Sequence, residues 1–115
     1  MPLIKLHTNV AVPEAKKDQL LSEISKAVAS VMSKPEQYVM VVAGHPEILM
    51  SGKSGPAAFV DIRSIGGLSA PINKKLSQKI CEILNKALAI PGERVYINFF
   101  SLDPSYWGYA GATFG

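Results

Sequence analysis

The chain has a single cysteine, Cys81, so an intrachain disulfide and Cys-x-x-Cys chemistry are both excluded. It has no basic and apolar leader, and its apolar runs fall short of the roughly 18 residues that a membrane span needs. The two histidines, His7 and His45, lie far apart without metal-ligand spacing, so no metal site is predicted. These absences favour a cytoplasmic protein with no membrane partner.

Charge is also sparse. Charged residues make up 18% of the chain, the net charge is only +3, and the lysines are scattered rather than gathered in a block. The strand expected near the C-terminus has aromatic residues but lacks the basic and glycine residues of an RNA-recognition signature, so no nucleic-acid partner is predicted. The 48% hydrophobic content of 115 residues predicts one domain, residues 1–115, with a modest core.

The pattern strand, helix, strand is expected twice. Apolar periodicity predicts six elements, at residues 1–8, 20–32, 38–43, 57–63, 71–88 and 95–100. Pro71 follows Pro13 by 58 positions, and Pro91 follows Pro35 by 56. We interpret this near-constant offset as a pseudo-two-fold duplication.

The duplication predicts an α+β fold of the order βαββαβ. Each helical crossover favours parallel pairing within its unit, which gives a four-stranded sheet with both helices on one face. Residues 38–43 are so apolar that this strand is expected in the centre of the sheet. The other sheet face is left bare, and monomers rarely tolerate such an apolar area. Oligomerisation through that face is therefore expected.

Pro2 follows the initiator methionine, and a small second residue favours removal of Met1. Pro2 would then carry a free secondary amine, whereas proline within a chain is an amide without a basic nitrogen. If Met1 is retained, Pro2 is no base. A strand over residues 1–8 would hold the amine at the edge of the core, but a frayed terminus is the competing interpretation.

Lys34 lies at the end of the first helix. A capping interaction with the helix dipole would explain it alone. The loop after a crossover helix also returns to the end of the sheet, so Lys34 can approach Pro2. A cation beside a partly buried amine lowers the pKa of that amine, and a neutral amine is a usable general base.

Two further segments allow two interpretations each. The C-terminal segment after Phe100 is rich in aromatic residues but broken by glycine, so it is either a lid or wall, or a tail held against its own core or a neighbouring subunit. Gly66 and Gly67 follow a strand and indicate either an anion-binding backbone or a plain turn.

Five separated motifs resemble the macrophage migration inhibitory factor (MIF) family of the tautomerase superfamily over essentially the whole chain. The motifs are Met1-Pro2, Lys34-Pro35 with Gln37-Tyr38, Ser64-Ile65-Gly66, Val95-Tyr96-Ile97-Asn98 and Thr113-Phe114. The resemblance implies a homotrimer of βαββαβ subunits. It also implies cofactor-independent keto–enol tautomerisation of aromatic α-keto acids such as phenylpyruvate, and of dopachrome-type substrates, at sites between subunits.

The resemblance also implies a role for each site residue. Pro2 would be the base, and Lys34 with Ser64 and the backbone N–H of Ile65 would bind the substrate carboxylate or enolate. Tyr96 and Asn98 would come from the adjacent subunit. The remaining site residues would form apolar walls around the aromatic ring: Tyr38, Trp107, Tyr109 and Phe114.

Several positions depart from the family pattern. Ala57-Ala58-Phe59-Val60 replaces a Cys-x-x-Cys motif, so thiol oxidoreductase activity is not expected. Trp107 and Tyr109 reshape the mouth of the pocket, and Arg63 stands where histidine is frequent. Two other functions remain open. One is a MIF-like cytokine or host-modulating protein with a vestigial pocket, released without a signal peptide and acting through an unknown receptor; the other is an oligomeric binding module for small aromatic acids.

Overall fold

The computed structural model describes all 115 residues. Two long helices and four long strands form the body of the fold, and short 3-10 turns (η) and a small hairpin complete it. The elements are β1 (Pro2–Thr8), α1 (Glu14–Met32), η1 (Glu36–Tyr38), β2 (Met40–Gly44), β3 (Ala58–Ser64), α2 (Ala70–Leu88), η2 (Gly92–Arg94), β4 (Val95–Ser101), η3 (Pro104–Tyr106), β5 (Gly108–Tyr109) and β6 (Ala112–Thr113).

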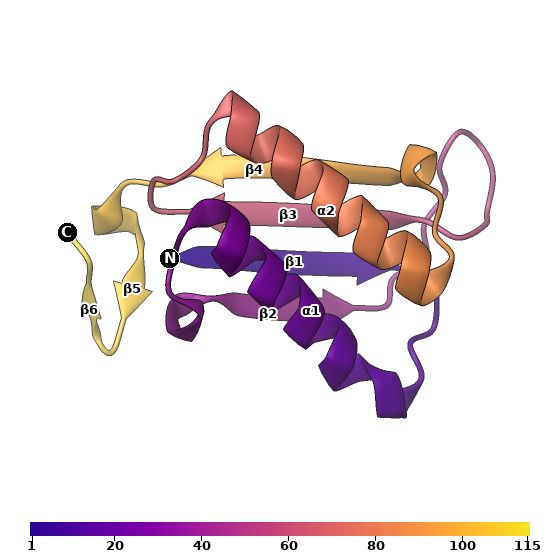
Figure 1. The fold of residues 1–115 in the computed structure, drawn as a ribbon, viewed down its shortest axis with the longest axis horizontal. Coiled ribbons are helices and arrows are strands. Elements are labelled where there is room, and N and C mark those ends of the chain that lie inside the picture. The colour runs from indigo at the N-terminus through magenta and orange to yellow at the C-terminus, as the bar shows by residue number, and fades with distance from the viewer.

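The four long strands form one mixed sheet in the order β2-β1-β3-β4 (Figure 1). β1 pairs in parallel with β2, and β3 pairs in parallel with β4, as the crossover argument predicts. The two units meet through an antiparallel pair of β1 and β3. The predicted four-stranded α+β fold is confirmed.

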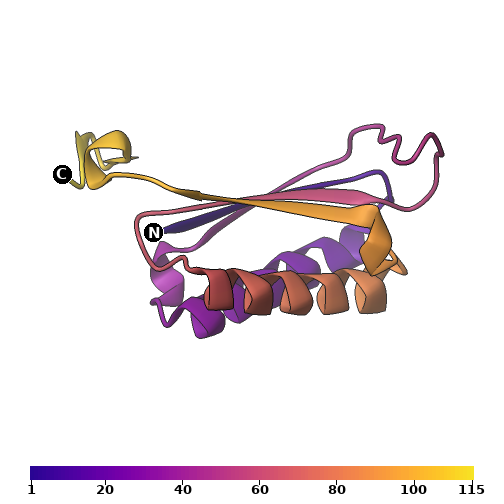
Figure 2. The same ribbon diagram turned by 90° about the horizontal axis from the view of Figure 1, so that it is seen from above.

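Both helices pack on the same face of the sheet, and the other face is open (Figure 2). Alternate residues of β1 point toward the helices, and its burial alternates accordingly between buried and half-buried side chains. Fifteen buried apolar residues form one core, and all but Ile90 belong to the long helices and the sheet. Burial of this apolar face is what holds the two units together.

The duplication extends to the details of each unit. α1 and α2 each contain 19 residues, and each ends at a residue in the left-handed conformation, Ser33 or Ala89. A proline and a 3-10 turn then follow in both units, at Pro35 and Pro91. The α2 helix has a Ser69 N-cap whose hydroxyl accepts from the N–H of Ile72, while α1 begins after Pro13 without a side-chain cap.

One prediction about the sheet was wrong. β2 lies at an edge, not in the centre, and Tyr38 belongs to η1 rather than to this strand. Met40 and Val42 are 62% and 43% exposed. Val41 packs against the core, whereas burial within this chain does not account for the apolar side chains of Met40 and Val42.

The open face carries both apolar and charged side chains, Lys5, Asp61 and Arg63 among the latter. Asp61 is buried to 7% exposure and accepts two hydrogen bonds from the Arg63 guanidinium, at 3.2 and 3.3 Å. The same guanidinium lies 4.9 Å from the centre of the Phe100 ring.

Neither helix is long and apolar enough to cross a membrane.

Candidate active site

Pro2 begins β1 at the end of the sheet where β3 and β4 finish (Figure 1). It pairs with Ser64, the last residue of β3, and Ser64 pairs with Ser101, the last residue of β4. The Pro2 side chain is fully buried. The frayed-terminus interpretation is therefore wrong, because the sheet fixes residue 2 in place.

Lys34 comes to the same end of the sheet from the C-terminal end of α1, in the same unit as Pro2. Its backbone N–H donates to Ala29 O at 3.0 Å and closes α1, but its side chain leaves the helix. The ammonium Nζ instead donates to the carbonyl oxygen of Ile65 at 3.1 Å. Capping by the side chain is thus not its role, and the expected approach to the end of the sheet is observed.

Gly67 makes room for this lysine. Its φ is +79°, and a Cβ at this position would lie 2.8 Å from Lys34 Cε. The preceding Gly66 also has a positive φ of +66°, but a Cβ there would meet nothing within 4 Å. From the sequence, the Gly-Gly pair after a strand predicted either a turn or an anion-binding loop. That pattern did not show that Gly67, and not Gly66, would contact Lys34.

The loop from Ser64 to Gly66 is fixed by a buried hydroxyl. Ser64 is fully buried, and its Oγ donates to the carbonyl oxygen of Gly66 at 2.7 Å. The carbonyl of Ser64 accepts from the N–H of Leu102 at 2.9 Å, which ties the C-terminal segment to this loop. The carbonyl oxygen of Ile65 accepts the hydrogen bond from Lys34. The sequence prediction concerned a different group, the Ile65 N–H, as a donor to the substrate.

The charge around the N-terminus disfavours a protonated amine. Where Met1 precedes Pro2, the free amine is that of Met1, and Pro2 is an amide. Burial lowers the pKa of the Met1 amine, and the Lys34 ammonium beside it lowers this pKa further. From the sequence, the same lowering of an amine pKa by Lys34 was predicted for the amine of Pro2.

Tyr96 and Asn98 do not join this site within one chain. Both are exposed on the open face of β4, and Tyr96 pairs in register with Phe59, which itself pairs with His7. Five strand positions separate His7 from Pro2, a distance of about 17 Å at the usual rise per residue. A contribution of Tyr96 to the Pro2 site would therefore require a second chain.

The predicted aromatic walls lie around the same end of the sheet. β5 and β6 form a small hairpin that projects beyond this end, on the side away from the helices (Figures 1 and 2). Within it the Tyr109 and Phe114 rings stack with their centres 5.2 Å apart, and the N–H of Phe114 donates to Trp107 O at 3.2 Å. Residues 108–115 are all exposed, so this tail is not held against its own core. Tyr38, in η1 soon after Lys34, is 39% exposed.

No three histidine, cysteine or acidic side chains cluster in a way that could hold a metal ion. Three hollows of about 190, 470 and 520 Å³ on the chain are lined by neither Pro2 nor Lys34. The N-terminal amine, the Lys34 ammonium and the loop with Gly66 and Gly67 lie together at the end of the sheet. This arrangement is suited to moving a proton beside a bound anion.

Comparison with known proteins gives one consistent result. The family model described as "Macrophage migration inhibitory factor (MIF)" matches residues 1–115. The macrophage migration inhibitory factor of Xenopus laevis is 36% identical over 99% of both chains, and the homolog of Trichuris trichiura is 38% identical over 99% of this chain and 100% of that relative. The crystal structure of the MIF-like protein from Entamoeba histolytica superposes with a TM-score of 0.94 at 29% identity, covering 98% of each chain. The chain therefore belongs to the macrophage migration inhibitory factor family, within the tautomerase superfamily.

Proposed function

We propose that this chain is a cofactor-independent keto–enol tautomerase of aromatic α-keto acids such as phenylpyruvate, with dopachrome-type compounds as further substrates. The observation that carries the proposal is the Lys34 ammonium beside the N-terminal amine, whose pKa it lowers together with burial. Removal of Met1 would transfer this environment to the secondary amine of Pro2.

In the proposed reaction Pro2 is the general base. Its neutral nitrogen takes a proton from the carbon next to the ketone, and the C–H electron pair becomes the enol double bond. The same proton is then returned to the ketone oxygen, so the amine is regenerated and no cofactor is consumed. A base of this kind contributes about 10²–10⁴ in rate.

Lys34 would bind the substrate carboxylate or the enolate oxygen. Its ammonium has three N–H donors, so it can donate to the substrate while it keeps the hydrogen bond to Ile65 O. The N–H of Ile65 and the Ser64 loop would complete the anion site, and the aromatic ring would lie among Tyr38, Trp107, Tyr109 and Phe114. Such walls exclude water and strengthen the electrostatic interactions.

The site would be completed by assembly into a homotrimer. The open sheet face and the exposed edge strand β2 support burial against further copies, and Tyr96, 67% exposed, is available to a neighbour's Pro2 site together with Asn98. Residues 1–115 would act as one domain in this assembly, in the cytoplasm or after release without a signal peptide.

The test uses protein whose intact mass shows that Met1 is absent. Ultraviolet absorbance should report turnover of phenylpyruvate or a dopachrome ester, and Pro2→Gly should lower it by about 10²–10⁴. Pro71→Gly, at an exposed position in the first turn of α2 on the helix side of the sheet, is the matched control and should retain activity.

Lack of turnover by the Met1-free protein would contradict the proposal. Binding of aromatic keto acids without turnover would then favour the binding module. Receptor binding that Pro2→Gly leaves unchanged would favour the MIF-like cytokine or host-modulating protein.

A further inference from the structure

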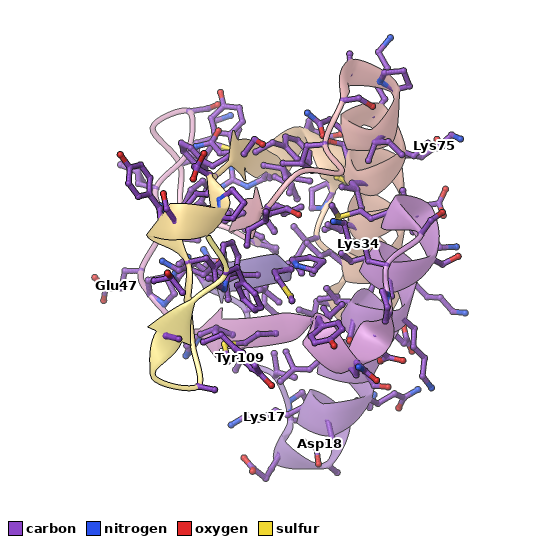
Figure 3. All side chains as sticks on the ribbon, turned by 90° about the vertical axis from the view of Figure 1, so that its left-hand side faces the viewer. Lys17, Asp18, Lys34, Glu47, Lys75 and Tyr109 are labelled. Carbon is purple, nitrogen blue, oxygen red and sulfur yellow. The ribbon has the colours of Figure 1, made fainter.

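Ser64, the last residue of β3, lies where three parts of the candidate site meet. It pairs with Pro2 on one side and with Ser101 on the other, because β3 lies between β1 and β4. Figure 3 looks onto this end of the sheet and shows Lys34 on the side of the helices and Tyr109 on the hairpin. The contacts of Ser64 indicate how these parts are held in register.

The Ser64 hydroxyl is already used within the loop. The residue is fully buried, and its Oγ donates to the carbonyl oxygen of Gly66 at 2.7 Å. A serine hydroxyl has one O–H to donate. A substrate carboxylate or enolate accepts hydrogen bonds, so this hydroxyl has no proton left to offer it.

The Ser64 carbonyl sets the direction of the next N–H. It accepts from the N–H of Leu102 at 2.9 Å, on the β4 side of β3. All peptide bonds of the chain are trans, so the C=O of Ser64 and the N–H of Ile65 point in opposite directions. The Ile65 N–H therefore points to the β1 side, where Pro2 lies, and it has no backbone acceptor within the chain.

The Ser64 hydroxyl also supports Lys34. Its bond to Gly66 O closes a tight turn around Ile65, whose carbonyl oxygen accepts from Lys34 Nζ at 3.1 Å. Gly66 and Gly67 have φ values of +66° and +79°, a conformation that glycine enters and leaves with little cost. Two such residues in succession need a further contact to keep one conformation, and the buried hydroxyl supplies it.

We propose that Ser64 is a positioning residue and not a substrate ligand: it holds residues 64–67 so that the Ile65 N–H faces Pro2 and the Ile65 carbonyl holds Lys34. The inference rests on the proposed function, because it assigns how that site is aligned. The bond from Leu102 extends the same arrangement to the C-terminal segment, which carries the hairpin. One buried serine thus aligns the N–H donor, the cation and the segment of the predicted aromatic walls.

Ser64→Ala, in protein without Met1, tests this role. Without the hydroxyl the loop loosens and Lys34 loses its fixed acceptor, so the ammonium should lie farther from the terminal amine on average. The pKa of that amine should rise, because the nearby Lys34 is one of the causes that lower it. The acidic limb of the kcat/KM profile should therefore move to higher pH, and kcat/KM at neutral pH should fall by about 10–10², the cost of misaligned groups.

Two variants accompany this one. Ser64→Cys keeps a weak S–H donor and should lie between Ser64→Ala and the wild type. It carries the same comparison if Ser64→Ala does not fold, which thermal unfolding shows. Ser101→Ala is the matched control, because it removes an exposed hydroxyl at the end of the neighbouring strand, and its pH profile should equal that of the wild type.

Titration of ¹⁵N-labelled Pro2 by NMR gives a readout that needs no turnover. A higher pKa of the Pro2 amine in Ser64→Ala supports the inference even if the protein is no tautomerase, so the two proposals fail separately. In a Lys34→Met background, Ser64→Ala should add little further shift, since both changes act through the same ammonium. An amine titration and a pH profile that stay in place overturn the inference: weaker substrate binding alone would make Ser64 a ligand, and lower stability alone would make it a structural residue.

Discussion

The Lys34 ammonium donates a hydrogen bond to the carbonyl oxygen of Ile65 at 3.1 Å, and this bond joins the two duplicated units at the N-terminus. Lys34 follows the helix of the first unit, and Ile65 follows the first strand of the second. The bond holds a cation over the end of the sheet, next to the chain's amine. The fold therefore places positive charge where a neutral base is proposed to act.

Replacing Lys34 by methionine should weaken both substrate binding and the base. Loss of the ammonium removes one of the causes that lower the pKa of the amine, so this pKa should rise. Activity that needs the neutral amine increases with pH through that pKa, so the acidic limb of the kcat/KM profile should move to higher pH. At neutral pH kcat/KM should fall by about 10²–10³, the usual cost of losing a group that stabilises developing charge. A profile that keeps its position would contradict the role given to Lys34.

Gly67→Ala and Gly66→Ala form a matched pair. Both introduce a side chain at a positive φ, which costs on the order of 1–3 kcal/mol in stability. Only the Gly67 variant also brings a Cβ within 2.8 Å of Lys34 Cε, so only this variant should displace the lysine. We expect similar losses in thermal stability and a much larger loss of kcat/KM for Gly67→Ala. Equal kinetic losses would show that the contact with Lys34 is unimportant.

Cys81 should be a slowly reacting thiol. Burial raises the pKa of the Cys81 thiol, so the reactive thiolate is scarce at neutral pH and becomes available only as pH rises. Alkylation followed by mass spectrometry should be slow at pH 7 in the folded protein and fast after unfolding. No disulfide reductase activity is expected, because residues 57–60 contain no cysteine. Rapid alkylation of the folded chain at pH 7 would contradict this.

Periodicity in the sequence predicted most of the fold, because the two helices and three of the four long strands bury one face within the chain itself. β2 shows the limit of this reasoning. Its apolar side chains Met40 and Val42 indicate burial but not by which chain, so an edge strand was placed in the centre. A pattern within one sequence does not separate a core from an interface between copies.

The position of Pro2 and Lys34 at one end of the sheet was predicted from the sequence, and their roles in a site remain predictions. Pro2 and Lys34 follow from a terminal proline and the geometry of a crossover, because both depend on local chain direction. The Lys34 ammonium donates to the Ile65 carbonyl, and Gly67 leaves space for the lysine side chain. Both contacts depend on the backbone conformation of a loop, which residue types do not specify. Tyr96 and Asn98 remain predictions, since within one chain they lie along the sheet away from Pro2.

Titration of the Pro2 nitrogen tests the central claim most directly. ¹⁵N-proline-labelled protein without Met1, in its assembled state, should show by NMR a pKa below the ordinary range of a terminal amine, with kcat/KM rising through the same pH. A Pro2 amine that stays protonated into the alkaline range while the enzyme turns over phenylpyruvate at neutral pH would contradict the account.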